Sequence, residues 1–345
     1  MLPVTDVFSD DIAIDLGTAN TLVSVKGRGV IIDEPSVVAI RSKGGLREVL
    51  AVGEKAKQMV GRTPESMETI RPLRDGVIAD FIATEEMLRQ FIKRAKTMLG
   101  FRRPRILICV PAGATPVERR AVYETAVSAG SRRVYLIEEP VAAAIGAGLA
   151  IDEPFGSMVV DIGGGTTDIA VLSLGDVVEA RSLKVAGNAF DEAIVRFVRR
   201  RHQLLIGETS AERIKIEAGS ALRDDGGGRD AEIHIKGRDL RQGKLKSIVL
   251  TPADVAEALS DPIEQMAEFV QRSIEDLPPE VSTDILTRGI YMTGGGALLD
   301  GLAEELERRV GVKCIVAEDP LLCVIKGSAM VLDELSKREH LLIKP

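Results

Sequence analysis

Two aspartates, Asp15 and Asp161, occupy matched positions in two similar stretches of the chain. Each follows a short apolar run and precedes a turn rich in glycine and threonine, in IAIDLGTANT (residues 12–21) and VVDIGGGTTD (residues 159–168). Such turns leave backbone N–H groups open to phosphate oxygens, because glycine has no side chain to block the approach. A carboxylate beside the turn can hold Mg²⁺ directly or through water, since this hard ion prefers oxygen ligands.

One copy of this motif would equally indicate a simple hairpin turn after a strand. Two copies, one in each half of the chain, predict two related halves that face a shared ligand, and they favour a nucleotide held between two lobes. A third turn, Gly294-Gly295-Gly296, also follows a strand-like apolar run. The sequence therefore contains three glycine-rich turns that each follow a predicted strand.

The segments between these turns alternate between strand-like and helix-like patterns. Ile106–Val110 is a compact apolar run that ends at Pro111, as a buried strand does, whereas residues 84–99 place apolar side chains at helical spacing. This alternation is typical of an α/β fold with mixed sheets flanked by helices. A chain of 345 residues exceeds one typical core, which favours two lobes.

Three helix starts can be predicted from capping residues. Thr84 is expected to cap the helix over 84–99, because acidic residues follow it. Thr115 is expected to precede a helix whose first residue is a proline. Asp319 and the proline after it are expected to start a helix over 320–335.

Composition narrows the class of protein. Lys and Arg total 45 against 52 Asp and Glu, a net charge of −7, which argues against nonspecific binding to nucleic acid. The three cysteines lie among apolar neighbours without CxxC spacing, so we expect buried free thiols in a reducing compartment. The acidic N-terminus does not resemble a signal peptide, and the longest apolar run, 141–151, is too short to span a bilayer. A cytoplasmic location is expected.

Several stretches together resemble the actin and heat-shock-chaperone ATPase superfamily, and most closely its MreB family of bacterial actins, the rod-shape-determining proteins. They are DIAIDLGTANT, CVPAGATPVERRAV, LIEEPVAAAIGAGL, MVVDIGGGTTDIAVLSL, AERIKIEAGSA, MTGGGALLDGL and VAEDPLLCV. They run in family order from about residue 11 to 327. The resemblance implies an actin-like ATPase fold. Lobe I would comprise 1–140 and 316–345 with a smaller subdomain at about 33–76, and lobe II 141–315 with one at about 185–248.

The resemblance also implies ATP and Mg²⁺ as ligands. Asp15 and Asp161 would hold the hydrated Mg²⁺ at the β- and γ-phosphates, the alternative being two turn-capping aspartates. Phosphate contacts would come from both turns, through Gly17, Thr18, Ala19, Asn20, Gly163, Gly164, Gly165 and Thr166. The adenosine side would involve Glu212, Lys215, Gly294, Gly295 and Gly296, with Asp168 and Gly187 completing the side of the cleft that lobe II forms. Glu212 and Lys215 could instead form a surface ion pair on one helix face.

Two further roles are implied, each with a competing neighbour. Glu139, directly before Pro140, matches the family residue that positions the attacking water, a task that suits a carboxylate. Its neighbour Glu138 could take that place while Glu139 merely caps the following helix, or the reverse. Lys57 aligns with a lysine that contacts the phosphate region in the chaperone relatives. Lys55 competes for this assignment, and either lysine could simply be a solvated residue of a helix face.

Family members assemble into filaments of paired protofilaments at the inner face of the cytoplasmic membrane. There they cooperate with membrane proteins of the cell-wall elongation machinery. The resemblance therefore implies a slow ATPase, peripheral at that membrane, which polymerises, determines rod shape by organising cell-wall synthesis and binds no nucleic acid. Met98, Leu99 and Phe101, flanked by basic residues, are the expected membrane contact. The alternative is that they end a helix against the core.

Two other functions remain open from the sequence. A metabolic sugar or acetate kinase of the same superfamily would need a catalytic aspartate and a pocket for a second substrate. A plasmid-segregating or organelle-positioning actin would share the chemistry but differ in its polymer and partners. In either case the small residues Ala144, Gly146 and Gly327 are expected at the hinge between the lobes, because they permit close crossing.

Overall fold

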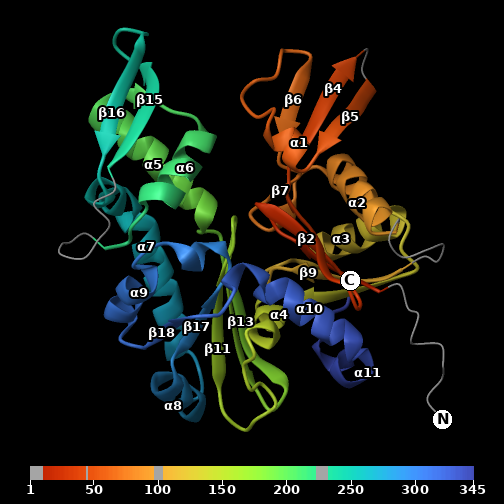
Figure 1. The fold of residues 1–345 in the computed structure, drawn as a ribbon. Coiled ribbons are helices and arrows are strands. Elements are labelled where there is room, and N and C mark those ends of the chain that lie inside the picture. The colour runs from red at the N-terminus through yellow and green to blue at the C-terminus, as the bar shows by residue number, and fades with distance from the viewer. Residues whose placement is uncertain (1–10, 44–45, 97–103, 223–231) are drawn as a thin grey trace.

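A computed structural model of the chain describes residues 11–43, 46–96, 104–222 and 232–345 (Figure 1). The expected membrane contact, Met98, Leu99 and Phe101, lies outside the described residues. None of the helices in the described part of the chain combines the length and apolar character that crossing a bilayer requires.

Two five-stranded sheets with the same internal order form the centres of the two lobes. In each sheet, three consecutive strands pair antiparallel. A later strand pairs in parallel with the first of them, and one more strand pairs in parallel with that later strand. The sheet of lobe I has the order β10 (Arg133–Glu138), β9 (Arg105–Val110), β1 (Ile12–Leu16), β2 (Asn20–Val25) and β3 (Gly29–Pro35). The sheet of lobe II has the order β13 (Asp176–Leu183), β12 (Thr167–Ser173), β11 (Ser157–Ile162), β17 (Ile290–Thr293) and β18 (Cys314–Val316). The prediction of two related halves is confirmed.

This repeat explains why the two aspartates occupy matched positions. Asp15 lies near the end of β1 and Asp161 near the end of β11, which are the central strands of their sheets. Each strand then turns into its antiparallel neighbour through a glycine-rich turn. The residues opposite the two acids differ, because Asp15 faces Leu22 across the ladder whereas Asp161 faces Asp168.

Helices cover the sheets and build three apolar cores. Those of lobe I are α2 (Phe81–Lys96) and α3 (Pro116–Ser128), and those of lobe II include α7 (Pro252–Glu275), α8 (Pro279–Arg288) and α9 (Leu302–Val310). The third core lies between the lobes, around α4 (Glu139–Gly146) and α10 (Cys323–Asp333). In the absence of tryptophan, these cores consist mainly of aliphatic side chains.

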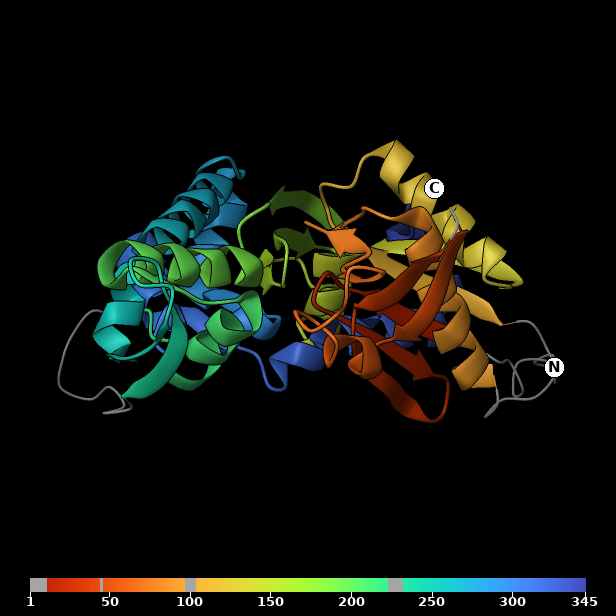
Figure 2. The same ribbon diagram turned by 90° about the horizontal axis from the view of Figure 1, so that it is seen from above.

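A smaller subdomain rises from each lobe at the same end of the molecule (Figure 1). In lobe I it contains β4 (Val38–Lys43), β5 (Leu46–Val52), α1 (Glu54–Lys57), β6 (Met67–Ile70), β7 (Leu73–Arg74) and β8 (Val77–Ile78). In lobe II it contains α5 (Gly187–His202), β14 (Leu204–Leu205), α6 (Glu208–Ala218), β15 (Ile233–Asp239) and β16 (Leu245–Leu250). Seen from above, the two subdomains stand on opposite sides of the molecule (Figure 2). The domain boundaries expected from the sequence remain a prediction.

The helices α4 and α10 cross at two glycines between the lobes. A Cβ atom on Gly146 would lie 1.8 Å from the carbonyl oxygen of Cys323, and one on Gly327 would lie 1.8 Å from that of Ala142. Real side chains cannot occupy such positions, so both glycines are required for the backbones to approach this closely. Below the crossing, Cys109 Sγ and Ser328 Oγ are 2.8 Å apart in a buried hydrogen bond.

The C-terminal segment contacts both lobes at the same end as this crossing. Ile343 donates its N–H to the carbonyl oxygen of Leu136 on β10. Arg338 forms two hydrogen bonds to Asp152 at 2.6 and 2.8 Å, and His340 Nε2 lies 2.8 Å from the carbonyl oxygen of Gly175. The base of the molecule is therefore tied together by α4, α10 and this segment.

The capping predictions had different outcomes. Thr115 caps α3 with a reciprocal bond from Glu118, as predicted. The prediction for Thr84 was wrong, because Asp80 starts α2 by accepting the N–H of Ala83 at 2.9 Å. Thr84 lies one turn later and donates its hydroxyl to the carbonyl oxygen of Asp80.

The predicted cap at Asp319 was also wrong. Its backbone is left-handed, with φ of 49°, and its carboxylate pairs with Lys326 instead of capping a helix. A 3₁₀ turn, η3 (Pro320–Leu322), follows, and α10 begins only at Cys323. The proline therefore marks a short turn rather than the first residue of a long helix.

Candidate functional site

A cavity of about 570 Å³ opens between the lobes and brings the three glycine-rich turns together. Its walls include all but one of the residues that the sequence predicts for a nucleotide site. They are Asp15, Gly17, Thr18, Ala19, Asn20, Lys57, Glu139, Asp161, Gly163, Gly164, Gly165, Thr166, Gly187, Glu212, Lys215, Gly294, Gly295 and Gly296. Asp168 is the exception. A volume of this size suits a ligand as large as a nucleotide.

The turns of the two lobes touch each other at the floor of the cavity. A Cβ atom on Gly164 would lie 2.7 Å from the Cβ of Ala19, and one on Gly165 would lie 2.7 Å from Thr18 Oγ1. Thr18 Oγ1 in turn accepts the N–H of Gly76 at 3.0 Å. Glycine at these positions therefore lets the two turns approach and surround a small group with backbone amides.

Buried carboxyl groups concentrate negative charge at this floor. Burial, followed by the repulsion of Asp161 and Asp33, raises the pKa of Asp15 to about 7. Burial also raises the pKa of Asp161 to about 7, although the Thr293 hydroxyl donates to its Oδ1 at 2.7 Å and opposes the rise. A cation bound beside these carboxyl groups would lower their pKa values and so favour their ionised forms.

This donor set fits Mg²⁺. Among the described residues, no group of three or more His, Cys, Asp and Glu side chains is arranged to hold a metal by itself. Mg²⁺ commonly takes one or two carboxylates together with water and substrate phosphates. Asp161, which is buried, and Asp15, which is partly buried, both line the cavity beside the glycine-rich turns. They therefore match the demands of a magnesium nucleotide better than those of a metal held by protein alone.

Glu139 and Glu138 lie in different environments, although they are adjacent in sequence. Glu139 is the first residue of α4, is buried, and lines the cavity. Burial and then the carboxylates of Asp168, Asp15 and Asp161 raise its pKa well above the usual range. Glu138 ends β10 outside the cavity lining, where burial raises its pKa and the nearby Arg119 opposes the rise. The geometry therefore favours Glu139 for chemistry in the cavity.

Asp168 lies behind the cavity wall rather than on it. Its Oδ1 accepts the backbone N–H of Ala112 at 3.0 Å, which connects β12 of lobe II to the loop after β9 of lobe I. Burial raises the pKa of Asp168, and hydrogen bonds from Thr166, Ser182 and Ala112 oppose the rise. The expectation that Asp168 completes the cleft is thus corrected, because its side chain is used in a contact between the lobes.

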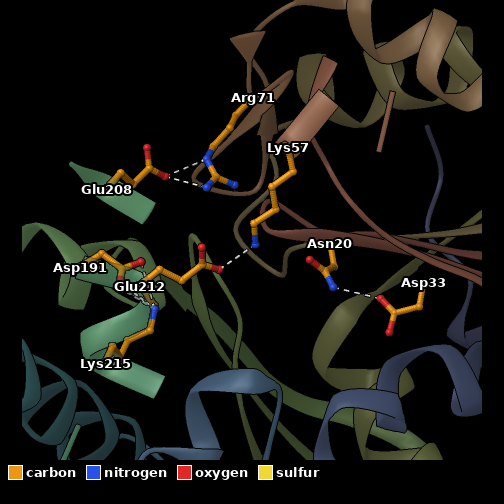
Figure 3. Close-up of polar contacts among 9 residues, drawn as sticks. Asn20, Asp33, Lys57, Arg71, Asp191, Glu208, Glu212 and Lys215 are labelled. Atoms are coloured by element: carbon orange, nitrogen blue, oxygen red, sulfur yellow. Dashed lines mark hydrogen bonds and ion pairs between the residues drawn. The ribbon is translucent and has the colours of Figure 1, made fainter. Parts of the chain in front are cut away.

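Of the charged side chains above the floor, one pair crosses the cavity and another stays within lobe II (Figure 3). Lys57 Nζ lies 3.0 Å from Glu212 Oε1, whereas Lys215 Nζ lies 3.0 Å from both the carbonyl oxygen of Gly187 and Asp191 Oδ2. The alternative of a Glu212–Lys215 surface pair is therefore wrong. Lys57 lines the cavity, while Lys55 is exposed and does not.

Among the cavity residues that escaped sequence reasoning are three large apolar ones. Ile216, Leu298 and Leu321 are large apolar residues that remain exposed while lining the cavity. They gather beside the third glycine turn, where a Cβ on Gly295 would lie 3.1 Å from Leu321 Cδ2. A flat apolar ring could cover them. The sequence contained only a weak signal for this apolar wall. Ile214 and Ala218 are among the residues on the buried face of α6, and Ile216 lies between them in sequence, off that face.

The third glycine turn is shaped by packing as well as by the cavity. Gly294 has φ of 79°, and its Cβ would lie 2.4 Å from the carbonyl oxygen of Ile162. A Cβ on Gly296 would lie 2.2 Å from Ile162 Cγ2. Glycine is therefore needed at both positions to seat the turn against the end of β11.

The raised pKa values predict an unusual pH dependence of stability. Each of the Asp15 and Asp161 carboxyl groups has an ordinary pKa of 3.8 and a pKa of about 7 in the folded protein. It stabilises the folded state fully when the pH is below its ordinary pKa, and this contribution is lost as the pH rises through its folded-state pKa. Without metal or nucleotide, stability should thus fall between pH 5 and 8, by about 1 kcal/mol per pH unit for each carboxyl. Urea unfolding in EDTA would measure this.

The Asp15→Asn variant provides the control for this prediction. It removes one of the two acids and should flatten the pH dependence, while every other ionisable side chain of the protein is unchanged. A parent protein whose stability is constant or rises from pH 5 to 8 would contradict the prediction.

Comparison with known proteins places this cavity in a family. The model of the MreB/Mbl protein family matches residues 9–340. The chain belongs to the MreB/Mbl family. This MreB/Mbl chain is 52% identical over 330 residues to the cell shape-determining protein MreB of Escherichia coli K12, covering 95% of this chain and 94% of that protein. It is 49% identical to the cell shape-determining protein Mbl of Bacillus subtilis 168, over 96% of this chain and 98% of that one.

Solved structures confirm the predicted actin-like ATPase fold for this MreB/Mbl chain. It resembles MreB5 of Spiroplasma citri bound to ADP with a TM-score of 0.89 and 36% identity, covering 95% of this chain and 97% of the other. The AMPPNP-bound form of MreB5 gives a TM-score of 0.87. The MamK double helical filament shares the fold with a TM-score of 0.77 at 22% identity, over 94% of this chain and 99% of that one.

Proposed function

We propose that this protein is a cytoskeletal ATPase that polymerises at the cytoplasmic membrane and determines rod shape by organising cell-wall synthesis. The observation that carries the proposal is the cavity between two matched turns, each preceded by an aspartate that lines the cavity, in a chain of the MreB/Mbl family. Support comes from relatives that are named cell shape-determining proteins. Further support comes from MreB5, which was solved with ADP and with AMPPNP.

The residues at the floor of the cavity suit phosphoryl transfer to water. Amides of the two turns would bind the phosphates, and Asp15 and Asp161 would hold Mg²⁺, which when bound would neutralise charge on the transferring phosphoryl group. Glu139, once ionised, accepts a hydrogen bond from the attacking water and orients it. Burial, followed by the repulsion of the neighbouring acids, raises the pKa of Glu139, so neutralising those acids would favour its ionisation. Hydrolysis would therefore wait for a complete magnesium nucleotide.

Self-association is supported by apolar side chains at opposite ends of lobe II. Leu174, in the turn between β12 and β13, is 71% exposed, and Leu245, at the start of β16, is 76% exposed. The hairpin of β15 and β16 lies at one end of the lobe, and the turn between β12 and β13 lies at the other (Figure 1). Exposed apolar side chains at opposite ends allow head-to-tail contacts, which generate filaments rather than closed dimers. MamK, which shares the fold, was solved as a double helical filament.

Leu174→Asp should prevent this assembly. A charge in an apolar contact must be desolvated without a partner, so the protein concentration needed for pelleting with Mg-ATP should rise about tenfold or more. Sedimentation at graded protein concentrations would measure it, with nucleotide binding retained. Val127→Asp is the matched control, because Val127 is also exposed but lies on α3 of lobe I. Equal pelleting of the Leu174 variant and the parent would contradict this contact.

The proposed function as a whole can be tested with purified protein. Sedimentation with Mg-ATP, with phosphate release recorded in the same tube and anionic vesicles added in a parallel series, should show pelleting, slow hydrolysis and association with the vesicles. A soluble protein that phosphorylates a small metabolite instead would overturn the cytoskeletal function in favour of a kinase. Hydrolysis and pelleting without vesicle binding would remove only the membrane part of the proposal.

A further inference from the structure

Two ion pairs connect the smaller subdomains across the opening of the cavity (Figure 3). Arg71, directly after β6, contacts Glu208 Oε1 through Nε at 2.9 Å and through its terminal nitrogen at 2.6 Å. Lys57 on α1 contacts Glu212 at 3.0 Å. Both glutamates lie on α6, four residues apart, and therefore on one helix face. That face is turned toward lobe I.

The two pairs differ in their relation to the cavity. Lys57 and Glu212 both line it, so a bound nucleotide can replace their mutual contact with contacts to itself. Arg71 also lines the cavity, but Glu208 does not. Glu208 sits in the first turn of α6 with half of its side chain exposed. The Arg71–Glu208 pair therefore lies at the rim, where it can persist above a bound ligand.

The position of this pair gives it mechanical leverage. The lobes are packed together at the base, through the third apolar core, the crossing of α4 and α10 and the C-terminal segment. A ligand that leaves between the smaller subdomains requires them to separate at the opposite end. Any contact across the opening there must break before the smaller subdomains can separate. Because such a contact lies far from the base of the molecule, it strongly opposes their separation.

We propose that Arg71 and Glu208 form a latch whose opening limits the release of bound nucleotide. The inference rests on the proposed function, because it requires that a nucleotide occupies the cavity. Arg71 acts here by holding the subdomains together, which is a different role from a direct contact to phosphate. The two roles can be separated, because exchanging the two charges preserves the latch but removes the arginine from position 71.

The test is the release rate of a fluorescent ADP analogue, chased with excess unlabelled ADP. Arg71→Glu and Glu208→Arg each place like charges across the opening, so release should become about five- to tenfold faster. The double variant restores an opposite pair and should return the rate to within about twofold of the parent. Salt should accelerate release from the parent but not from Arg71→Glu, since the pair is partly exposed and screened by ions.

Arg213 and Glu217 offer a matched control on the same helix. They form an exposed ion pair four residues apart on α6, and Arg213 Nη2 approaches the carbonyl oxygen of His234 within the same subdomain. Exchanging their charges should leave the release rate unchanged. Arg71→Gln, a milder change, guards against misfolding of the reversed variants and should accelerate release about threefold.

Three outcomes would overturn the latch. The single reversals could release the analogue at the parent rate. The double variant could stay as fast as the single variants, which would assign Arg71 to a direct contact with the ligand. A parent protein that binds no ADP analogue at all would overturn the proposed function, and the latch with it.

Discussion

Replacing Glu139 by glutamine is expected to reduce phosphate release about a hundredfold or more, while the protein still pellets with Mg-ATP. Glutamine keeps the size of the side chain but carries no negative charge. Its amide oxygen therefore accepts a weaker hydrogen bond from the attacking water than the carboxylate does. The buried position of Glu139 at the start of α4, on the wall of the cavity, is the physical basis. Phosphate release per subunit, measured in the same tube as sedimentation, separates hydrolysis from assembly.

Glu138 provides the matched control for this prediction, because it is the same residue type one position earlier. It lies outside the cavity lining, near Arg119, so Glu138→Gln should hydrolyse ATP at close to the parent rate. If Glu138→Gln abolished hydrolysis and Glu139→Gln did not, the assignment of the two glutamates would have to be reversed. Loss of nucleotide binding in Glu139→Gln would instead indicate a structural role.

Replacing Gly146 by valine should destabilise the protein by about 3 kcal/mol or more. The first side-chain carbon would overlap the carbonyl oxygen of Cys323, at a separation of 1.8 Å, and a backbone atom in a packed helix cannot move aside cheaply. Urea unfolding without nucleotide would measure the loss. Because α4 and α10 join the lobes, polymerisation should also fail.

Gly207→Val is the control for the loss of a glycine. Gly207 has φ of −89°, which any residue adopts, and a Cβ there meets no other atom within 4 Å. This variant should remain close to the parent in stability. If Gly146→Val were equally stable and polymerised normally, the hinge predicted at Ala144, Gly146 and Gly327 would have to be abandoned.

Local sequence signals were sufficient for the repeat and for the floor of the cavity. The turns after Asp15 and Asp161 could be identified because a strand, an acid and a glycine turn are consecutive in sequence, and the pairing of β1 with β2 and of β11 with β12 is local. Thr115 was correctly predicted as a cap for the same reason. Thr84 was not, since Asp80 offers a competing side chain four residues earlier.

Contacts between distant segments could not be derived in this way. Lys57 and Glu212 are 155 positions apart, and Arg71 and Glu208 are 137 positions apart. Their pairing depends on how the two lobes are oriented, which no single segment encodes. Likewise, the Asp168 side chain could be placed at the cleft from its motif, but its bond to Ala112 is a property of the assembled lobes.

The tight crossing of α4 and α10 sets where motion is small and where it is large. Points near a pivot move little when two bodies rotate, and points far from it move most. The strands β1 and β11, which lead into the first two glycine-rich turns, pack against α10 and α4, whereas the hairpin of β15 and β16 lies at the far end of lobe II (Figure 1). Small adjustments around a phosphate group are therefore magnified at the exposed tip that carries Leu245. In a filament of such subunits, a change at the cavity of one subunit would therefore move its contact with the next subunit and alter the shape of the polymer.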